Sequence, residues 1–202
     1  MTIRLAASDN ATAIRVGYTL VETAWGAVGL VCRGRRVCGL LPPGPRPQTL
    51  RRMILHDWPG AAFAAGVLPA VQEALREYLA GRRVSFACAI DTSWASPFVR
   101  AVLRACCTVD LGQCATYGRL ARQIHRPRAA RAVGAALAAN RTPILIPCHR
   151  IIAADGRLGG YSAHGGAPLK ARLLAHERQI VLAAESPSVR TPGCDNPAAK
   201  QT

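Results

Sequence analysis

The feature that most constrains this chain is a change of pattern near Asp91–Ser96, where short strand-like segments give way to segments with helix caps. Before the change, three segments rich in β-branched and apolar residues predict strands, and Gly34 marks a hairpin turn between the last two. These strands are Thr19–Thr23, Ala27–Cys32 and Val37–Leu41. A chain divided in this way predicts a sheet-based unit followed by a mainly helical one.

The first unit also carries helical signals. A loop rich in proline and glycine precedes Gln48–Trp58, a helix with weak periodicity. Pro69–Ala80 has a clearer apolar stripe, which includes Leu75 and Tyr78. Val84–Ile90 then predicts a closing strand. Together these segments predict a small α/β unit in which we identify no catalytic constellation.

Helix caps organise the second unit. Ser96-Pro97 combines a capping hydroxyl with a proline at the first helical position, and a short helix capped by its first residue is expected over Thr116–Ile124. A further helix over Arg128–Asn140 follows closely, so the pair resembles a helix-turn-helix. A short buried strand, Ile144–Ile146, and a last helix, Pro168–Gln179, complete the unit.

These patterns predict an N-terminal α/β domain over residues 1–95 and a C-terminal domain over residues 96–182. Residues 183–202 are rich in proline, serine, alanine and glycine and are expected to form a disordered tail. No apolar run approaches the ~20 residues that a membrane span needs, and the N-terminus lacks the pattern of a signal peptide. We therefore expect a cytoplasmic, nucleoid-associated protein with no membrane partner.

The charge of the chain is strongly positive and unevenly distributed. The formal net charge is +15. Residues 96–182 hold thirteen basic side chains against three acidic ones, whereas residues 1–95 hold eleven against six. A surplus of this kind favours a polyanionic partner, because each neutralised phosphate releases counterions. A GC-rich genome, which encodes arginine where other genomes encode lysine, is an alternative source of this composition, so the clustering in the second unit is the more informative observation.

One of the eight cysteines has neighbours that suggest chemistry. None of the eight forms a C-x-x-C pair or has zinc-ligand spacing, so we expect reduced thiols and no metal site. Cys148 lies in Pro147-Cys148-His149-Arg150, where an imidazole and positive surroundings would lower the thiol pKa and favour the nucleophilic thiolate. A buried structural thiol can also precede a histidine, so the tetrapeptide alone leaves both interpretations open.

The segments around Cys148 help to decide between a reactive and a structural thiol, because several of them stand in a characteristic order. They are Thr116-Tyr117-Gly118-Arg119-Leu120-Ala121, Arg131-Ala132-Val133-Gly134, Asn140, Ile144–Ile152, Leu158–Ser162 and Leu173–Glu177. This series resembles the O6-alkylguanine-DNA alkyltransferase family, also called the methylated-DNA–protein-cysteine methyltransferase family. The resemblance covers roughly residues 96–180, and the first half of the chain matches only in general layout.

The resemblance implies a fold and an activity. The fold would be an RNase H-like α/β domain followed by a mainly α, winged-helix-like domain with a helix-turn-helix. The activity would be DNA repair by a monomer that binds double-stranded DNA containing O6-alkylguanine. The alkyl group would pass from O6 of guanine, or O4 of thymine, to the protein's own cysteine. The product is a stable thioether, so each molecule would act once and without a cofactor.

Four residues match the family's catalytic positions. Cys148 resembles the alkyl acceptor, His149 the base that acts through a water molecule, and Glu177 the carboxylate that orients the base. Other enzymes activate a nucleophile with the same combination, in which a base accepts its proton and a third group orients the base. Asn140 resembles the residue that ties the recognition helix to the active-site loop, although its spacing is equally compatible with a helix C-cap.

Five residues match positions that contact DNA. A base inside the duplex is shielded from a protein thiol, so the nucleotide must rotate out of the stack. Tyr117 resembles the residue that helps to push the base out, and Arg131 the side chain that fills the vacated space. The small side chains of Ala129, Ala130 and Gly134 would let the helix approach the minor groove, although an ordinary alanine-rich helix would look the same.

The loop after the cysteine completes the expected site. Tyr161 and Ser162 resemble the segment that covers the flipped base and provides donors toward the guanine oxygen, and we group Arg150 with these DNA- and base-binding residues. Two departures from the family concern this region. Arg141 stands where proline is usual, and the loop before Lys170 is about two residues longer than the common version. The preferred size of the alkyl group is therefore left open.

Three other functions share some of these features. A non-catalytic relative that binds alkylated DNA would lack a cysteine at position 148, and the cysteine is present. A helix-turn-helix regulator would share the basic charge but would not need Pro147-Cys148-His149-Arg150. A cysteine hydrolase would need an oxyanion hole and would not need a groove-binding helix.

Overall fold

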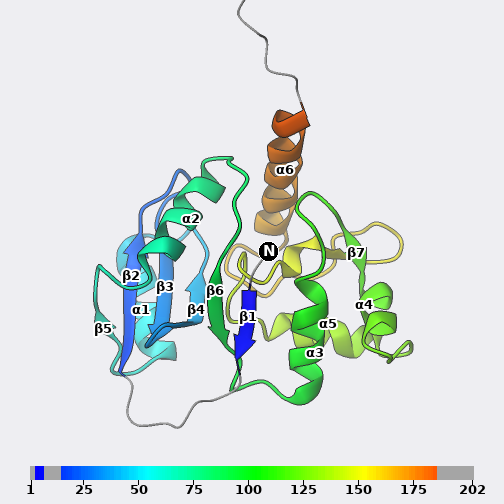
Figure 1. Cartoon of the computed structure of the whole chain (residues 1–202), viewed down its shortest axis with the longest axis horizontal. Coiled ribbons are helices and arrows are strands. Elements are labelled where there is room, and N and C mark those ends of the chain that lie inside the picture. The colour runs from blue at the N-terminus through cyan, green and yellow to red at the C-terminus, as the bar shows by residue number, and fades with distance from the viewer. Residues whose placement is uncertain (1–2, 7–14, 186–202) are drawn as a thin grey trace, which may run out of the picture.

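The computed structural model describes residues 3–6 and 15–185. A six-stranded mixed sheet has the strand order β1-β6-β4-β3-β2-β5. It lies beside a group of helices formed by the second half of the chain (Figure 1). The strands of this sheet are β1 (Ile3–Ala6), β2 (Val16–Val21), β3 (Val28–Arg33), β4 (Arg36–Leu41), β5 (Ala62–Phe63) and β6 (Cys88–Asp91). The chain thus combines a mixed sheet with helices, as predicted.

The central strands form where the sequence predicted them, with shifted ends. Strands β2, β3 and β4 are antiparallel neighbours, and the turn at Gly34 has a φ of 59°, which glycine adopts without strain. The strand predicted to end at Thr23 ends at Val21, because Thr23 forms a turn in which its Oγ1 donates to the carbonyl of Gly26. Strand β6 begins later than predicted, and the short edge strands β1 and β5 were not predicted.

Within the described residues, two α-helices belong to the first half of the chain and four to the second. They are α1 (Pro47–Asp57), α2 (Pro69–Leu79), α3 (Pro97–Cys106), α4 (Tyr117–Gln123), α5 (Ala130–Ala138) and α6 (Gly166–Glu185). The caps are as predicted, since Ser96 accepts from the backbone N–H of Val99 and Thr116 accepts from that of Arg119. Helix α6 extends beyond the predicted end, so residues 183–185 are helical, and the rest of the predicted disordered tail lies outside the described residues.

The predicted strand at Ile144–Ile146 is wrong. Ile144 has a φ of 73°, and the backbone N–H of Ile146 donates to the carbonyl of Thr142 at 2.9 Å, so the segment folds back as a turn. An isolated bridge between Pro143 and Ile146 is its one strand-like feature. The burial was predicted correctly, because side chains 144–146 are at most 2 % exposed. The following residues form a 3-10 turn, η1 (Cys148–Arg150), and a two-stranded parallel pair, β7 (Ala115–Thr116) and β8 (Ile151–Ile152).

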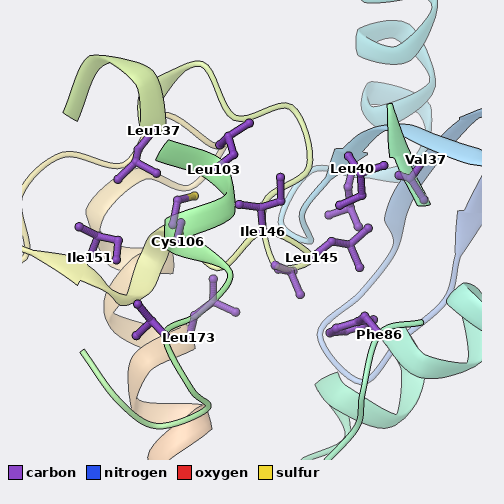
Figure 2. Packing of buried hydrophobic residues seen from close by; sticks show 14 of the residues in the cluster. Val37, Leu40, Phe86, Leu103, Cys106, Leu137, Leu145, Ile146, Ile151 and Leu173 are labelled. Atoms are coloured by element: carbon purple, nitrogen blue, oxygen red, sulfur yellow. The ribbon is translucent and has the colours of Figure 1, made fainter. Parts of the chain in front are cut away.

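The core explains how the two halves are joined. Alternate residues of the sheet face opposite sides, so Val31 packs with α1 in a smaller cluster while Leu30 belongs to the main cluster. The main cluster is continuous across both halves of the chain. Figure 2 shows Leu145 and Ile146 lying between Leu40 on the sheet side and Leu103 on the helical side. In residues 3–6 and 15–185, no helix has the length and apolar composition needed to cross a membrane.

Candidate active site

A cavity of about 460 Å³ lies where the α4–α5 pair, the 3-10 turn η1 and the glycine-rich loop of residues 156–165 meet. Its lining is Tyr117, Gly134, Ala135, Leu137, Ala138, Cys148, Gly160, Tyr161 and Ser162. Pro147 precedes the 3-10 turn η1 and directs the chain so that Cys148 faces this cavity, with 8 % of the residue exposed. The cysteine is therefore buried but reachable from the cavity.

Asn140 holds the thiol and the turn before it. Its Nδ2 donates to Sγ of Cys148 and to the carbonyl of Ile146, each at 3.1 Å. Its Oδ1 accepts from the backbone N–H of Thr142 at 3.0 Å. Asn140 follows Ala139, the C-cap of α5, so it lies just beyond the helix in which it was predicted. The side chain links the end of α5 to the cysteine, which is the role that the resemblance implied and the C-cap interpretation did not.

The thiol is a weaker acid than the sequence predicted. Burial raises the pKa of Cys148, while the hydrogen bond from Asn140 and the charge of Lys170 act in the opposite direction without cancelling the effect. The adjacent imidazole is itself kept neutral, because burial lowers the pKa of His149. The expectation that the surroundings favour the resting thiolate is therefore wrong. A base must remove the thiol proton when the cysteine reacts.

His149 and Glu177 are fully buried and hydrogen-bonded to each other. Nε2 of His149 lies 2.8 Å from Oε1 of Glu177. Burial alone would raise the pKa of Glu177, but hydrogen bonds from His149 and Arg150 hold it well below its usual range. An ionised carboxylate can only accept, so Nε2 carries the imidazole proton. Nδ1 is then the free basic nitrogen, and it is buried without a hydrogen-bond partner in the described part of the chain.

The assignment of Arg150 to DNA or base binding is wrong. Its Nε donates to Oε2 of Glu177 and its Nη2 to Oε1, both at 2.8 Å, and its Nη1 donates to the carbonyl of Val109 at 2.6 Å. Only 6 % of Arg150 is exposed. A guanidinium with this geometry forms a bidentate pair that stabilises the buried carboxylate, so it is not available to a phosphate or a base.

Helices α4 and α5 place the other predicted DNA-contacting residues on one side of the cavity. Arg131 lies exposed in the first turn of α5, and half-buried Ala129 and Ala130 begin that helix. Gly134 lies close to the ring of Tyr117. A Cβ added at Gly134 would be 3.7 Å from Cε1 of that ring. Four more exposed arginines lie on α4 and on the turn after it, namely Arg119, Arg122, Arg126 and Arg128.

The glycine-rich loop covers the cavity from the other side. The Ser162 hydroxyl donates to the carbonyl of Ala138 at 2.7 Å, and so connects the loop to α5. The Tyr161 hydroxyl is buried without a partner among the described residues. Beneath the loop, buried Lys170 donates to the carbonyl of Ile151 at 2.5 Å and also to that of Leu158. The structure therefore brings Tyr161 and Ser162 to the same cavity as Cys148, as predicted.

Sequence reasoning missed two groups that complete the carboxylate site. Tyr78 donates from its hydroxyl to Oε1 of Glu177 at 2.8 Å, and the backbone N–H of Gly112 donates to Oε2 at 3.2 Å. Tyr78 matched the apolar stripe of its helix, which is also the pattern of an ordinary core residue, so no signal in the sequence distinguished it. Within residues 3–6 and 15–185, no cluster of three or more histidine, cysteine or acidic side chains could hold a metal ion.

Comparison with known proteins identifies relatives of this chain. Residues 97–179 match the family model described as 6-O-methylguanine DNA methyltransferase, DNA binding domain. The chain is 41 % identical over 112 residues to a methylated-DNA–protein-cysteine methyltransferase of Shigella flexneri, which covers 55 % of this chain and 64 % of that protein. It is 35 % identical over 132 residues to the inducible enzyme of that name from Bacillus subtilis, covering 62 % of this chain and 72 % of that protein.

The similarity extends to three-dimensional structure. A crystal structure of Mycobacterium tuberculosis OGT in complex with DNA superposes with a TM-score of 0.68 and 29 % sequence identity. The superposition covers 81 % of this chain and 94 % of that one. The sequence match to the Shigella protein spans less than two thirds of that protein, whereas the structural match spans most of both chains.

Proposed function

This chain belongs to the methylated-DNA–protein-cysteine methyltransferase family, and on that premise we propose that it repairs alkylated DNA by taking the alkyl group onto Cys148. The substrate is double-stranded DNA that carries O6-alkylguanine, or O4-alkylthymine. The observation that carries the proposal is the arrangement around one cavity, in which Cys148 faces the space, Asn140 binds its sulfur, and the buried pair His149–Glu177 lies beside it.

The transfer needs no cofactor, because the thiol and the alkylated base supply both the bond that forms and the bond that breaks. The sulfur of Cys148 attacks the alkyl carbon, a bond between sulfur and carbon forms, and the bond between that carbon and the guanine oxygen breaks. His149 accepts the thiol proton at Nδ1 through a water molecule, and the electron pair of the broken bond stays on the guanine oxygen. Glu177 stabilises the imidazolium that results. Water does not cleave the thioether product, so each molecule acts once.

Recognition of the damaged base is the second part of the proposal. Helix α5 enters the minor groove, where the small residues Ala129, Ala130 and Gly134 permit close approach. Arg131 fills the space that the damaged nucleotide leaves, and Tyr117 helps to displace the base. The base then occupies the cavity under Tyr161 and Ser162. Exposed arginines of α4 and α5 support the contact with phosphates.

We also propose a fold for each of the two domains. We assign residues 1–95 to an RNase H-like domain and residues 96–182 to a winged-helix-like domain, supported by the mixed sheet of the former and the α4–α5 pair of the latter. We propose further that the protein acts on DNA as a monomer in the cytoplasm.

The test is intact-protein mass spectrometry after incubation with a duplex oligonucleotide that contains one O6-methylguanine. The proposal expects a single methyl-sized gain that saturates at one per protein and maps to Cys148. Cys148→Ala should bind the duplex and gain nothing, whereas Cys114→Ala, at an exposed cysteine, should behave as the parent. Tight binding without a gain in the parent protein would instead identify a non-catalytic damage-binding protein.

A further inference from the structure

We infer that Tyr78, on a helix of the first half, is a positioning residue for alkyl transfer and acts on His149 through Glu177. The inference deepens the proposed function, because it gives the α/β half of the chain a part in the reaction beyond that of a scaffold. It concerns the hydroxyl group of Tyr78 alone. The ring of the same residue has a separate role in packing.

The position of Tyr78 is determined by contacts from two directions. Helix α2 carries it into the core, where 2 % of the residue is exposed. Its ring lies edge-on to Phe86, with ring centroids 5.7 Å apart. The carbonyl of Tyr78 accepts from Nε2 of His176 at 2.6 Å, and the next residue of α6, Glu177, accepts from the Tyr78 hydroxyl at 2.8 Å. Two successive residues of α6 thus bind both the backbone and the side chain of Tyr78.

The hydroxyl shares an acceptor with the catalytic histidine. Oε1 of Glu177 accepts from three donors, which are Tyr78, Nε2 of His149 and Nη2 of Arg150. Burial and the neighbouring carboxylate raise the pKa of Tyr78 well above its usual value, so the phenol remains a neutral donor. A carboxylate oxygen with three donors offers less negative charge to each of them than an oxygen with two. Tyr78 therefore limits how strongly Glu177 holds a proton on His149.

Removal of the Tyr78 hydroxyl, a neutral group, takes no charge away from the surroundings of His149. The titratable and charged groups of the surrounding elements are Glu177 and Lys170 on α6, Cys148 and Arg150 on η1, Cys106 on α3, Tyr161 on the glycine-rich loop and Tyr78 on α2. Without the phenol proton, Oε1 attracts the imidazole more strongly, and the protonated form of His149 gains stability. His149 must be neutral to accept the thiol proton, so the loss is greatest at acidic pH.

The test is the rate of methyl transfer across a range of pH for the parent and for Tyr78→Phe. The substitution keeps the ring and removes the hydroxyl. We expect transfer roughly threefold slower on the acidic side of the profile, the size of effect that one hydrogen bond provides, and convergence with the parent at alkaline pH. Binding to the methylated duplex should be unchanged. The matched control is Phe86→Leu, which alters packing against the same ring and should leave the shape of the pH profile as in the parent.

A second measurement does not depend on transfer. The Nε2 proton of His149 should resonate further downfield in Tyr78→Phe than in the parent, because Oε1 has lost a competing donor. An unchanged resonance and an unchanged pH profile would overturn the role of Tyr78. A parent protein that takes no methyl group would overturn the proposed function instead, and the resonance would still decide the relation between Tyr78 and His149.

Discussion

The side-chain amide of Asn140 donates to the sulfur of Cys148 across 3.1 Å, from a residue just beyond α5 to a residue in the 3-10 turn η1. Helix α5 is also the element that carries Arg131. The contact therefore joins the helix expected to enter DNA to the atom expected to react. A shift of α5 on binding DNA would therefore alter the position of the Asn140 amide relative to the Cys148 sulfur.

Asn140→Ala should slow methyl transfer about tenfold at neutral pH. The amide hydrogen bond lowers the pKa of Cys148 against the effect of burial, so its removal raises that pKa further and makes the thiolate harder to form. The deficit should shrink as pH rises, because deprotonation becomes easier in both proteins. Rates measured from pH 6 to pH 9 would show this. Thr142→Val, which loses a contact to the Asn140 carbonyl oxygen but none to sulfur, is the control. A deficit independent of pH would contradict the prediction.

Glu177→Gln should destabilise the protein by about 3 kcal/mol at pH 7, because buried Arg150 loses its counter-ion. The folded-state pKa of Glu177 is depressed, so its contribution is present above the unfolded pKa of about 4.3 and is lost as pH falls. The difference in unfolding free energy between parent and variant should therefore narrow below about pH 4.3. Urea denaturation at several pH values measures it. The control is Glu73→Gln, at the exposed ion pair between Glu73 and Arg76, which should change the free energy of unfolding little. A constant difference would argue against an ionised Glu177.

Arg131→Ala should reduce transfer from duplex DNA about tenfold and leave transfer from single-stranded DNA unchanged. The side chain is exposed at the start of α5, and filling the vacated stack matters only when a base must leave a duplex. Single-turnover rates at saturating protein separate this effect from binding. Arg51→Ala, an exposed arginine on α1, provides a control of equal charge. Equal losses on both kinds of DNA would exclude the intercalating role.

Affinity for undamaged duplex DNA should fall steeply as salt increases. Exposed arginines on α4 and α5 would displace counterions from phosphates, each contributing a slope of about 0.9 in a plot of log affinity against log salt. Arg122→Ala should reduce that slope by about one phosphate contact. Titrations at several salt concentrations provide the slope. A flat response in the parent would place the basic surface away from DNA.

Local signals in the sequence were sufficient for much of the fold. The hydroxyls of Ser96 and Thr116 bond to backbone groups three residues away, so their pattern predicts helix starts without knowledge of the rest of the chain. The hairpin turn at Gly34 was likewise predicted from its local sequence. The segment Ile144–Ile146 shows the limit, because an apolar run predicts burial but does not distinguish a strand from a buried turn.

The sequence by itself determined the basic surplus and most of the helix and strand pattern, and through family resemblance it predicted the reacting groups around Cys148. Only the tertiary structure decided how the buried charges pair. Tyr78 lies 99 positions from Glu177, and Arg150 could have faced either DNA or this carboxylate. The choice depends on which partner the packed core brings within hydrogen-bond distance. Burial also decided that the Cys148 thiol rests protonated, because desolvation of a charge arises only after the chain has packed around it.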